Sequence, residues 1–411
     1  MDVRLQTLAD QLEPEVIAWR RHFHEFPELS NREFNTAKKV AAELTAMGLE
    51  PNTDFGGTGV VAILNGGKPG PLVGLRADMD ALPVEERVDL PFASKARGTY
   101  RGNDVPVMHA CGHDTHMAML LGAAKALVAV QDSLAGSVMF VFQPAEEGAP
   151  EGEEGGAERM LSEGLFEFAK PDVMFGLHTF SNLPAGMIAY RSGPAMASSD
   201  RFSIIVNGKQ THGSRPWGGV DPIVTAAQII MAVQTIASRQ VDVTKAPSVV
   251  SFGLINGGVR NNIIPDAVEL VGTIRNFDMG IRAQIHEKLQ HTAHTVADSA
   301  GATADVEIDL GYPVTVNDPA LTAQMLPTIK RVLGDDKVVE APLVTGAEDF
   351  SYYAQQVPGL FLYLGGSPAG VDLTTVASNH SPLFYVDEST LKAGVNVLTH
   401  LVTDYMAQAA D

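Results

Sequence analysis

Residues 115–142 read THMAMLLGAAKALVAVQDSLAGSVMFVF, a helix pattern followed by a strand pattern. The helix pattern covers residues 115–130, and the short run at 137–142 is rich in the Val and Phe residues that strands favour. Another strand pattern, LVGLRA, precedes the helix at residues 72–77. Strand, helix and strand in this order predict an alternating α/β unit with a mainly parallel sheet. Because continuous apolar runs are typical of a sheet buried on both sides, we expect helices on both faces.

The segments around this unit extend it and interrupt it. Further α/β patterns predict strands at residues 59–64, 173–177 and 359–364, and helices at residues 5–19, 35–47, 319–332 and 389–406. After Ser192 the order changes to strand, helix, two strands, helix and strand, at residues 202–207, 222–238, 248–255, 267–274, 281–300 and 304–310. This is one β-α-β-β-α-β module. We therefore expect an α/β domain at residues 1–189 and 309–411, interrupted by an inserted α+β domain at residues 190–308.

The composition is that of a globular protein without a nucleic-acid or membrane partner. A chain of 411 residues is longer than one hydrophobic core usually holds, so we expect more than one core. Its formal net charge of −20 would repel nucleic-acid phosphates and anionic lipid. The most apolar helix pattern, at residues 117–130, is too short to span a bilayer, and the N-terminus has no apolar signal core. The single cysteine excludes an intrachain disulfide, so we expect a cytoplasmic protein in which Cys111 has another role.

Five residues that can bind metal or move protons fall within eight positions, namely His109, Cys111, His113, Asp114 and His116. In an extended segment, side chains two apart point the same way, so Cys111 and His113 can converge on one ion. Asp114 or Thr115 would then cap the following helix. A lone cysteine or histidine is more often packed or exposed without a function. Four such residues in one turn favour a metal site.

The motif PAEEG at residues 144–148 follows an apolar strand and places Glu146 beside Glu147. This is the carboxyl end of a strand, where α/β sheets form their sites. Adjacent carboxylates on an extended chain diverge, so one can bind metal while its neighbour faces substrate as a general base. The alternative is a solvated acidic loop, because four more glutamates follow by residue 158.

Polar residues also end other strands of the predicted sheet. Arg76, Asp78 and Asp80 alternate at the end of one strand and so share one face. His178 ends another strand, and His380 follows the last apolar strand and a glycine-rich loop. Each histidine alone is more often a core or surface residue than a ligand. Because the ends of parallel strands meet in one crevice, their combination favours a shared site.

The inserted module carries three polar motifs, GKQTHGSRP at residues 208–216, NNIIPD at 261–266 and GTIR at 272–275. Their candidate functional residues are His212, Asn262 and Arg275. From the residues alone, His212 and Asn262 are equally well explained as turn residues, and Arg275 as a surface charge.

These motifs stand in the order of one known family, together with RADMDALP (76–83), HACGHDTH (109–116), GLH (176–178), GAEDFSYY (346–353) and NHSP (379–382). Over almost its whole length, the chain resembles the hippurate hydrolase and N-acyl-amino-acid amidohydrolase family, which includes plant enzymes acting on indole-acetyl amino acids. That family belongs to the aminoacylase and carboxypeptidase group of dimetal peptidases.

The resemblance implies a site with two divalent metal ions. Its ligands would be Cys111, His113, Glu147, His178 and His380. Glu146 would be the general base, and Asp80 the carboxylate that orients a ligand. Many relatives in the wider group bridge the metals with an aspartate, and Cys111 takes that place here. Because a thiolate is a softer ligand, zinc and manganese are both open as the native metal.

The resemblance also implies roles for the inserted domain. It would be a dimerisation or lid domain in a homodimer or tetramer, with His212 reaching the active site of the partner subunit. Glu146 would take a proton from water and pass it to the leaving amine, while His212 polarises the carbonyl oxygen. Arg275 and Asn262 would hold the carboxylate of a small N-acyl amino acid. The acyl group of the substrate is not determined, and acetyl, benzoyl, indole-acetyl and fatty acyl groups are all candidates.

Three other classes fit parts of this pattern. A dipeptidase or carboxypeptidase would use the same metal site on a substrate whose acyl part carries a free amine. A cysteine hydrolase would use Cys111 as its nucleophile, but the Cys-X-His spacing suits joint ligation better and leaves the paired glutamates idle. A non-catalytic binding protein on the same fold would not need Glu146 beside Glu147.

Overall fold

The computed structural model describes residues 1–409, which form two compact units, each with its own apolar core. The first unit contains Met1–Gly193, Val316–Pro342 and the chain from Tyr352 onward. The second unit contains Pro194–Thr315 and Leu343–Ser351. Three of the crossings between them lie in short elements, β8 (Gly193–Met196), β15 (Thr315–Asn317) and α9 (Phe350–Ala354).

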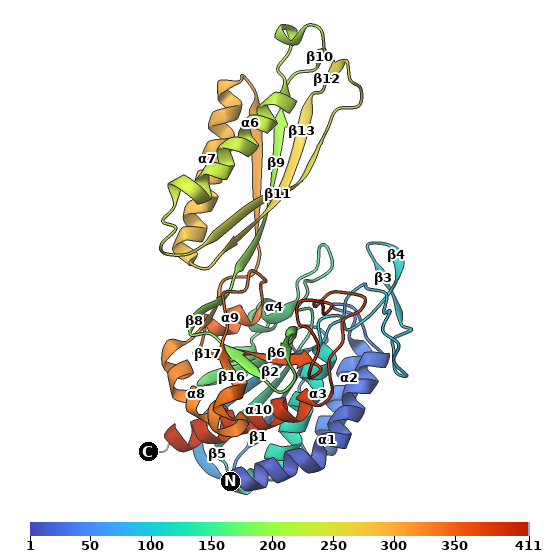
Figure 1. The fold of residues 1–411 in the computed structure, drawn as a ribbon, viewed down its shortest axis with the longest axis vertical. Coiled ribbons are helices and arrows are strands. Elements are labelled where there is room, and N and C mark those ends of the chain that lie inside the picture. Colours follow the sequence, from blue (N-terminus) through green and yellow to red (C-terminus); the bar gives the residue numbers. More distant parts are fainter. Residues whose placement is uncertain (410–411) are drawn as a thin grey trace. The chain divides into compact units, whose positions relative to one another are not determined.

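A seven-stranded sheet in the order β1-β5-β2-β6-β17-β7-β16 is the centre of the first unit (Figure 1). The strands β5, β2, β6 and β17 are parallel, as are β7 and β16. β1 is antiparallel to β5, and β7 is antiparallel to β17. The strands are β1 (Val60–Asn65), β2 (Lys68–Asp78), β5 (Ala135–Gln143), β6 (Val173–Pro184), β7 (Ile188–Tyr190), β16 (Val338–Glu340) and β17 (Gly359–Ser367).

Helices cover this sheet and pack on one another. They are α1 (Asp2–Glu25), α2 (Phe34–Ala46), α3 (His113–Val128), α4 (Gly156–Ser162), α5 (Leu165–Phe168), α8 (Pro319–Leu333) and α10 (Thr390–Ala409). α3 and α10 both contact β2 and β6, and α1 packs against both helices. Nearly every side chain of α3 is buried, which explains its all-round apolar sequence. β3 (Arg97–Tyr100) and β4 (Asn103–Pro106) form an antiparallel hairpin outside the seven-stranded sheet.

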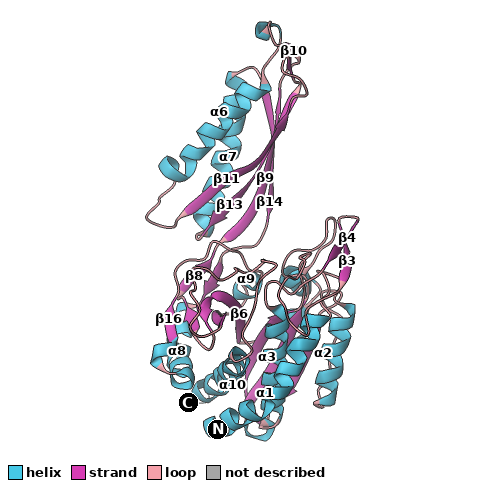
Figure 2. Cartoon of the chain, turned by 45° about the vertical axis from the view of Figure 1, so that its right-hand side comes forward, coloured by secondary structure: helices cyan, strands magenta, loops and turns pink. Residues whose placement is uncertain are grey.

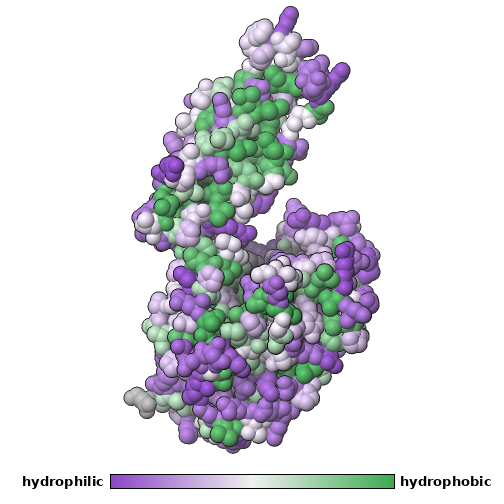
Figure 3. All heavy atoms as spheres, viewed as in Figure 1, coloured by the Kyte–Doolittle hydropathy of each residue, from purple (hydrophilic) through white to green (hydrophobic). Residues whose placement is uncertain are grey.

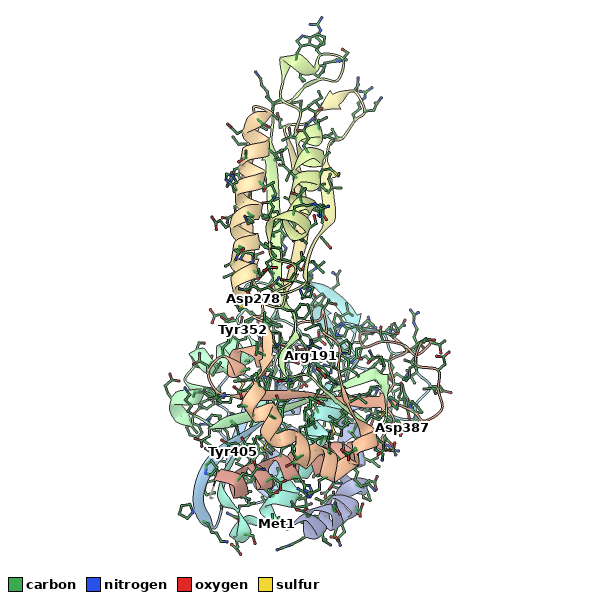
Figure 4. All side chains as sticks on the ribbon, turned by 60° about the vertical axis from the view of Figure 1, so that its left-hand side comes forward. Met1, Arg191, Asp278, Tyr352, Asp387 and Tyr405 are labelled. Atoms are coloured by element: carbon green, nitrogen blue, oxygen red, sulfur yellow. The ribbon has the colours of Figure 1, made fainter. Side chains whose placement is uncertain are left out.

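The second unit is a four-stranded antiparallel sheet in the order β11-β13-β9-β14, with α6 and α7 packed on it and on each other (Figure 2). A two-stranded ladder of β10 and β12 continues beyond one end of this sheet. Asp278, labelled in Figure 4, follows β13 at the opposite end and caps α7 by accepting the N–H of Ile281 at 2.8 Å. The elements are β9 (Ser198–Asn207), β10 (Thr211–His212), α6 (Pro222–Thr235), β11 (Ser248–Gly257), β12 (Ile263–Ile264), β13 (Ala267–Asn276), α7 (Met279–Ser299) and β14 (Thr303–Leu310).

The predicted fold class is confirmed, with a mainly parallel α/β sheet and an inserted β-α-β-β-α-β module. The predicted module helix at 222–238 ends earlier as an α-helix and continues as a π-helical turn over Ile236–Gln240. The unpredicted strands are two to four residues long, too short for a hydrophobic period to appear. Within residues 1–409, no helix combines the length and apolar character that crossing a bilayer requires.

Candidate metal centre and active site

The ends of β2 and β5 form a buried polar edge of the sheet. Asp78 lies in register with Gln143 of β5. Arg76 donates from Nη1 to Asp78 Oδ2 at 2.6 Å and from Nε to Gln143 Oε1 at 2.9 Å. The predicted alternation of Arg76 and Asp78 therefore produces a buried ion pair, and the chain then leads directly to Asp80.

Cys111 and His113 come together through a tight turn. α3 begins at His113, and Gly112 at its N-cap has φ 91°, a left-handed conformation that glycine adopts without strain. The expected extended segment is therefore wrong, and the predicted helix start at residue 115 is two residues late. The ligand atoms of Cys111 and His113 nevertheless lie within 4.8 Å of each other.

Asp114 and Thr115 do not provide the predicted helix cap. Asp114 is buried and accepts from Arg20 Nε at 3.0 Å, while His24 Nδ1 lies 2.8 Å from the same oxygen. Burial alone would raise the pKa of Asp114, but Arg20 and His24 hold it below its usual range. The Thr115 hydroxyl donates to the carbonyl of Gly112 at 2.6 Å. Asp114 is thus part of an internal ion pair.

Two further histidines of the cluster, His109 and His116, are buried. His116 Nδ1 lies 2.6 Å from Asp78 Oδ1, and its Nε2 accepts from the N–H of Thr179 at 2.7 Å, so both nitrogens are engaged. Within residues 1–409, the ring nitrogens of His109 have no hydrogen-bond partner, and burial lowers its pKa to about 3. His109 is therefore neutral at physiological pH, and no hydrogen bond of the described chain gives it a role.

Two buried carboxylates hold the turn that carries Glu146 and Glu147. Asp80 accepts from the backbone N–H groups of both glutamates, at 3.0 Å each. Glu33 accepts from the N–H of Ala145 at 2.9 Å. Ala145 has φ 53°, a left-handed conformation that costs a non-glycine residue about 1–3 kcal/mol. Three consecutive N–H groups are thus captured, which stabilises this strained turn.

This turn brings the two glutamate side chains close together, where an extended chain would separate them. Glu146 Oε2 lies 3.8 Å and Glu147 Oε1 lies 4.0 Å from His113 Nε2. The expected divergence of the two carboxylates is therefore not observed, because the left-handed residue Ala145 bends the chain before them. Both side chains face the N-terminus of α3.

Glu33 is a residue of this site that the sequence did not indicate. Its side chain is buried, and Thr58 donates its hydroxyl to the second carboxylate oxygen at 2.7 Å. Burial, followed by repulsion from Asp80, raises the pKa of Glu33 to about 8. In the sequence Glu33 looks like an ordinary residue before a helix, and no spacing to the metal motifs distinguishes it.

His178 and His380 meet at the sulfur of Cys111. His178 lies inside β6, opposite Tyr363 of β17, and not at a strand end as predicted. Its Nε2 is 3.4 Å from Cys111 Sγ. His380 Nε2 is 3.2 Å from the same sulfur and 3.1 Å from Glu147 Oε1. All five predicted ligands are therefore brought together within the first unit.

Asn379 connects β6 to the turn before α3, a role that no sequence pattern predicted. Its side-chain amide donates to the carbonyls of Cys111 at 3.3 Å and Thr179 at 2.9 Å. Its oxygen accepts from the N–H of Ser181 at 3.3 Å. The next residue, His380, has φ 70°. Asn379 thus anchors the strained loop that presents His380 to the sulfur.

The predicted ligands fall into two groups that share Cys111. Ligand atoms of Cys111, His113 and His178 lie within 4.8 Å of one another, and so do those of Cys111, Glu147 and His380. Among the described residues, His113 Nε2 is buried without a hydrogen-bond partner, which is costly unless a ligand satisfies it. Thiolate, imidazole and carboxylate are the donors of transition-metal sites. These donors therefore have the chemistry to hold two divalent cations, and Cys111 belongs to both groups.

The electrostatics of the cluster favour a cation. Burial, followed by the Glu147 carboxylate, raises the pKa of Cys111 well above its ordinary value. Burial lowers the pKa of His113, but Asp78 and the neighbouring carboxylates outweigh it and raise the pKa to about 10. The protein alone would therefore keep protons on Cys111 and His113. A bound divalent cation would displace these protons, because metal ligands must be deprotonated.

The second unit brings His212 and Asn262 together but not Arg275. His212 of β10 lies opposite Ile263 of β12, the neighbour of Asn262. β13 begins at Ala267 beside this ladder, and Arg275 is next to its last residue. At roughly 3.3 Å per residue, Arg275 lies about 26 Å along the strand from Ala267. His212 and Asn262 therefore lie near the first residue of β13, and Arg275 lies near its last residue.

Asn262 and Arg275 each have a polar side-chain group that is available to bind a ligand. The side-chain oxygen of Asn262 is buried without a hydrogen-bond partner among the described residues. Arg275 is half-buried, and burial lowers its pKa, with Asp200 acting in the opposite direction. Within residues 1–409, the guanidinium of Arg275 forms no hydrogen bond or ion pair. Both side chains can therefore bind a further polar group.

Comparisons with known proteins match this geometry to a family. Residues 74–404 match "Peptidase family M20/M25/M40". The chain is 42% identical over 393 residues to thermostable carboxypeptidase 1 of Saccharolobus solfataricus, with 95% of each chain covered. It is 37% identical over 389 residues to N-acetyl-L-cysteine deacetylase of Bacillus subtilis, covering 95% of this chain and 86% of that protein. A crystal structure described as a dinuclear metal-binding peptidase of the M20 family, from Bacillus subtilis, has a TM-score of 0.79 and 32% identity, covering 97% and 99% of the two chains.

The matches extend over nearly the whole chain, including both units. They confirm the resemblance drawn from the ordered motifs, because a deacetylase of an N-acetylated amino acid and a carboxypeptidase both stand among the relatives. The protein is therefore a metal-dependent hydrolase of amide bonds, and it belongs to peptidase family M20/M25/M40.

Proposed function

We propose that this protein hydrolyses N-acyl-L-amino acids to a carboxylic acid and a free amino acid at a site with two divalent metal ions. The observation that carries the proposal is Glu146 beside two ligand groups that share Cys111. Metal-assisted hydrolysis needs this combination of ligands and a separate general base. The relative that deacetylates N-acetyl-L-cysteine supports an N-acyl substrate.

The roles of the side chains follow from their surroundings. Bound metal ions would polarise the amide carbonyl and make water a better nucleophile. Glu146 would accept the proton of the attacking water and return it to the leaving amine. Asp80 holds the backbone of Glu146, so the carboxylate stays beside the ligand His113. Asp80 would therefore act by positioning the base.

The ligand set also bears on the metal and the compartment. We propose that Cys111, His113, Glu147, His178 and His380 would hold the two ions, with Cys111 in both ligand groups. A thiolate suits zinc, while the imidazole and carboxylate donors also suit manganese. Because the single cysteine must stay reduced to bind metal, we propose a cytoplasmic protein.

The carboxylate of the substrate needs its own partners, for which we propose Arg275 and Asn262. A planar guanidinium suits a planar anion. One chain cannot bring Arg275 together with His212 and Asn262 at a small substrate, because about 26 Å of β13 separates the two ends. The separation supports a site completed by two chains, in which His212 and Asn262 come from one chain and Arg275 from the other.

Apolar side chains on the second unit support pairing of two copies. β11 is an edge strand of its sheet, so its outer backbone groups are open to pairing. Figure 3 shows apolar atoms gathered on this unit. The exposed apolar residues on α6 and β11 include Ile223, Val224, Met231, Leu254 and Ile255. We therefore propose a homodimer in which residues 190–308 form the dimerisation domain.

A carboxypeptidase or dipeptidase is the second candidate, because the 42% identical relative is named a carboxypeptidase. It would use the same metals, base and carboxylate partners. A cysteine hydrolase is disfavoured, since burial raises the pKa of Cys111 and a cysteine nucleophile needs a lowered pKa.

A hydrolysis panel tests the proposal directly. Demetallated protein would be reloaded with zinc, manganese or cobalt and given N-acetyl, N-benzoyl, indole-acetyl and N-fatty-acyl amino acids beside dipeptides with free amines. We expect the highest kcat/KM on an N-acyl amino acid. Faster hydrolysis of the dipeptides would establish the peptidase alternative, and the best metal would appear in the same experiment.

A further inference from the structure

The turn after His212 uses the imidazole ring as one of its hydrogen-bond acceptors. The N–H of Gly213 donates to the carbonyl of Asn262 at 2.8 Å, and that of Arg215 donates to the carbonyl of His212 at 2.7 Å. The N–H between them, from Ser214, donates to Nδ1 of His212 at 3.0 Å. The Ser214 hydroxyl lies 2.8 Å from the same nitrogen. Each of the three N–H groups thus has one acceptor.

This bonding fixes where the ring carries its proton. A backbone N–H can only donate, so Nδ1 must offer its lone pair to Ser214. The neutral ring then has its proton on Nε2. We infer that Ser214 is a positioning residue that holds His212 as the Nε2–H tautomer, ready to donate a hydrogen bond to the substrate's carbonyl oxygen. This inference rests on the role of His212 in the proposed function.

The same turn occurs at two aspartates of this chain. Asp242 Oδ1 accepts from the N–H of Thr244 at 2.9 Å and from its hydroxyl at 2.7 Å. Asp372 Oδ1 accepts from the N–H and hydroxyl of Thr374 at the same two distances. An ionised aspartate can only accept. In the turns at Asp242 and Asp372, the first residue is a carboxylate that can only accept hydrogen bonds. His212 occupies the equivalent position in its own turn.

The surroundings of the turn leave the other ring nitrogen available. His212 is exposed, and among the described residues its Nε2 takes part in no hydrogen bond. A Cβ atom on Gly213 would lie 3.1–3.2 Å from the backbone of Asn262. Glycine at this position therefore allows the turn to approach β12 closely while the imidazole stays at the surface.

The tautomer decides which chemistry His212 can perform. An Nε2–H group can stabilise negative charge that develops on a carbonyl oxygen. It cannot take a proton or bind a metal ion through Nε2 without first losing its own proton. His212 would therefore act as a donor, and Glu146 would be the base of the reaction.

Nitrogen NMR determines the tautomer of His212 independently of enzyme activity. In protein with ¹⁵N-labelled histidine rings, the signal absent from His212→Gln identifies this residue. At about pH 8 we expect an unprotonated Nδ1 and a protonated Nε2, because Nδ1 accepts the N–H of Ser214. A proton on Nδ1 would overturn the inference and leave the proposed function standing.

Variants of Ser214 connect the tautomer to turnover. Ser214→Ala keeps the N–H and should retain the tautomer and kcat within about threefold. Ser214→Pro removes the N–H and should give mixed tautomers with kcat about tenfold lower and KM little changed. Thr244→Pro makes the same change in a matching turn and should leave both readouts unchanged.

Two outcomes contradict the inference in different ways. If Ser214→Pro and Thr244→Pro have equal kcat, Ser214 does not serve the reaction. If His212→Gln keeps full turnover on N-acyl amino acids, the proposed role of His212 fails and the inference fails with it. Because the NMR signal is independent of turnover, the two failures are distinguishable.

Discussion

The metal centre of the first unit and the polar residues of the second unit differ in how much of a site one chain supplies. In the first unit, ligand atoms from α3, β6 and three loops lie within 4.8 Å in each group, and buried carboxylates hold the backbone of the turn before Glu147. In the second unit, His212 is exposed and lies at the other end of the sheet from Arg275. The five proposed ligands therefore come together within one chain. The proposed substrate-binding residues of the second unit do not.

Removal of metal should have the largest effect on the self-contained centre. We expect chelation to abolish hydrolysis and added zinc or manganese to restore it, because Glu146 alone cannot polarise an amide. Metal content and turnover would be followed together. Full activity of demetallated protein, combined with its loss on thiol alkylation, would instead make Cys111 a nucleophile.

The paired glutamates should separate into two phenotypes. Glu146→Gln should keep metal content near that of the wild type and lower kcat by about a hundredfold or more, the scale of a lost general base. Glu147→Gln should lose metal, since Glu147 Oε1 belongs to a ligand group with Cys111 and His380. Elemental analysis and steady-state kinetics check both. Equal metal loss in the two variants would contradict the division of roles.

Mixed dimers test whether the second unit serves a partner chain. Homodimers of Glu146→Ala or of His212→Ala should each be nearly inactive. In a mixed dimer, one site has both defects and the other has neither, so with random pairing about a quarter of all sites should be intact. Turnover of the co-expressed population measures this recovery, and after purification of the tagged mixed dimers about half of the sites should be intact. Verified mixed dimers without recovery would place His212 in the site of its own chain or remove it from catalysis.

Substitution of Arg275 should have a smaller and selective effect. Arg275→Lys keeps the charge but loses the planar fork, so kcat/KM for free N-acyl amino acids should fall by about tenfold. Carboxamide analogues of the same substrates should be hydrolysed at nearly unchanged rates. A uniform loss on both substrate types would indicate that Arg275 has a structural role.

The sequence predicted which side chains lie close together in the first unit better than it predicted their geometry. Long apolar runs such as residues 137–142 predicted their strands, because periodicity reports burial directly. The left-handed Ala145 could not be predicted, because the Glu33 carboxyl that accepts its N–H lies 112 residues away in the sequence. Asp114 and His116 have ligand chemistry but are engaged by Arg20 and Asp78. Motif spacing reports which residues are near, and only packing decides which of them are free to bind.

The buried residue Glu33 offers the smallest expected effect on turnover. Glu33→Gln keeps an oxygen that can accept the N–H of Ala145, so kcat should fall by no more than about threefold. Glu33→Ala removes this acceptor and should lower kcat further, because the strained turn before Glu146 loses its support. Glu43→Gln on α2, which changes a surface pair with Lys39, is the matched control.

The pH dependence of the free energy of unfolding separates two roles of Glu33, its hydrogen bond to Ala145 and its ionisation. The folded protein raises the pKa of Glu33 from an ordinary 4.5 to about 8. Between these values the folded state keeps a proton that the unfolded state has released, so Glu33 makes the free energy of unfolding fall as pH rises, by up to about 1.4 kcal/mol per pH unit. Glu33→Gln should remove this slope, and Glu43→Gln should keep it. Denaturant unfolding at several pH values measures the slopes, and equal slopes in wild type and Glu33→Gln would mean that the buried carboxyl is already charged near pH 5.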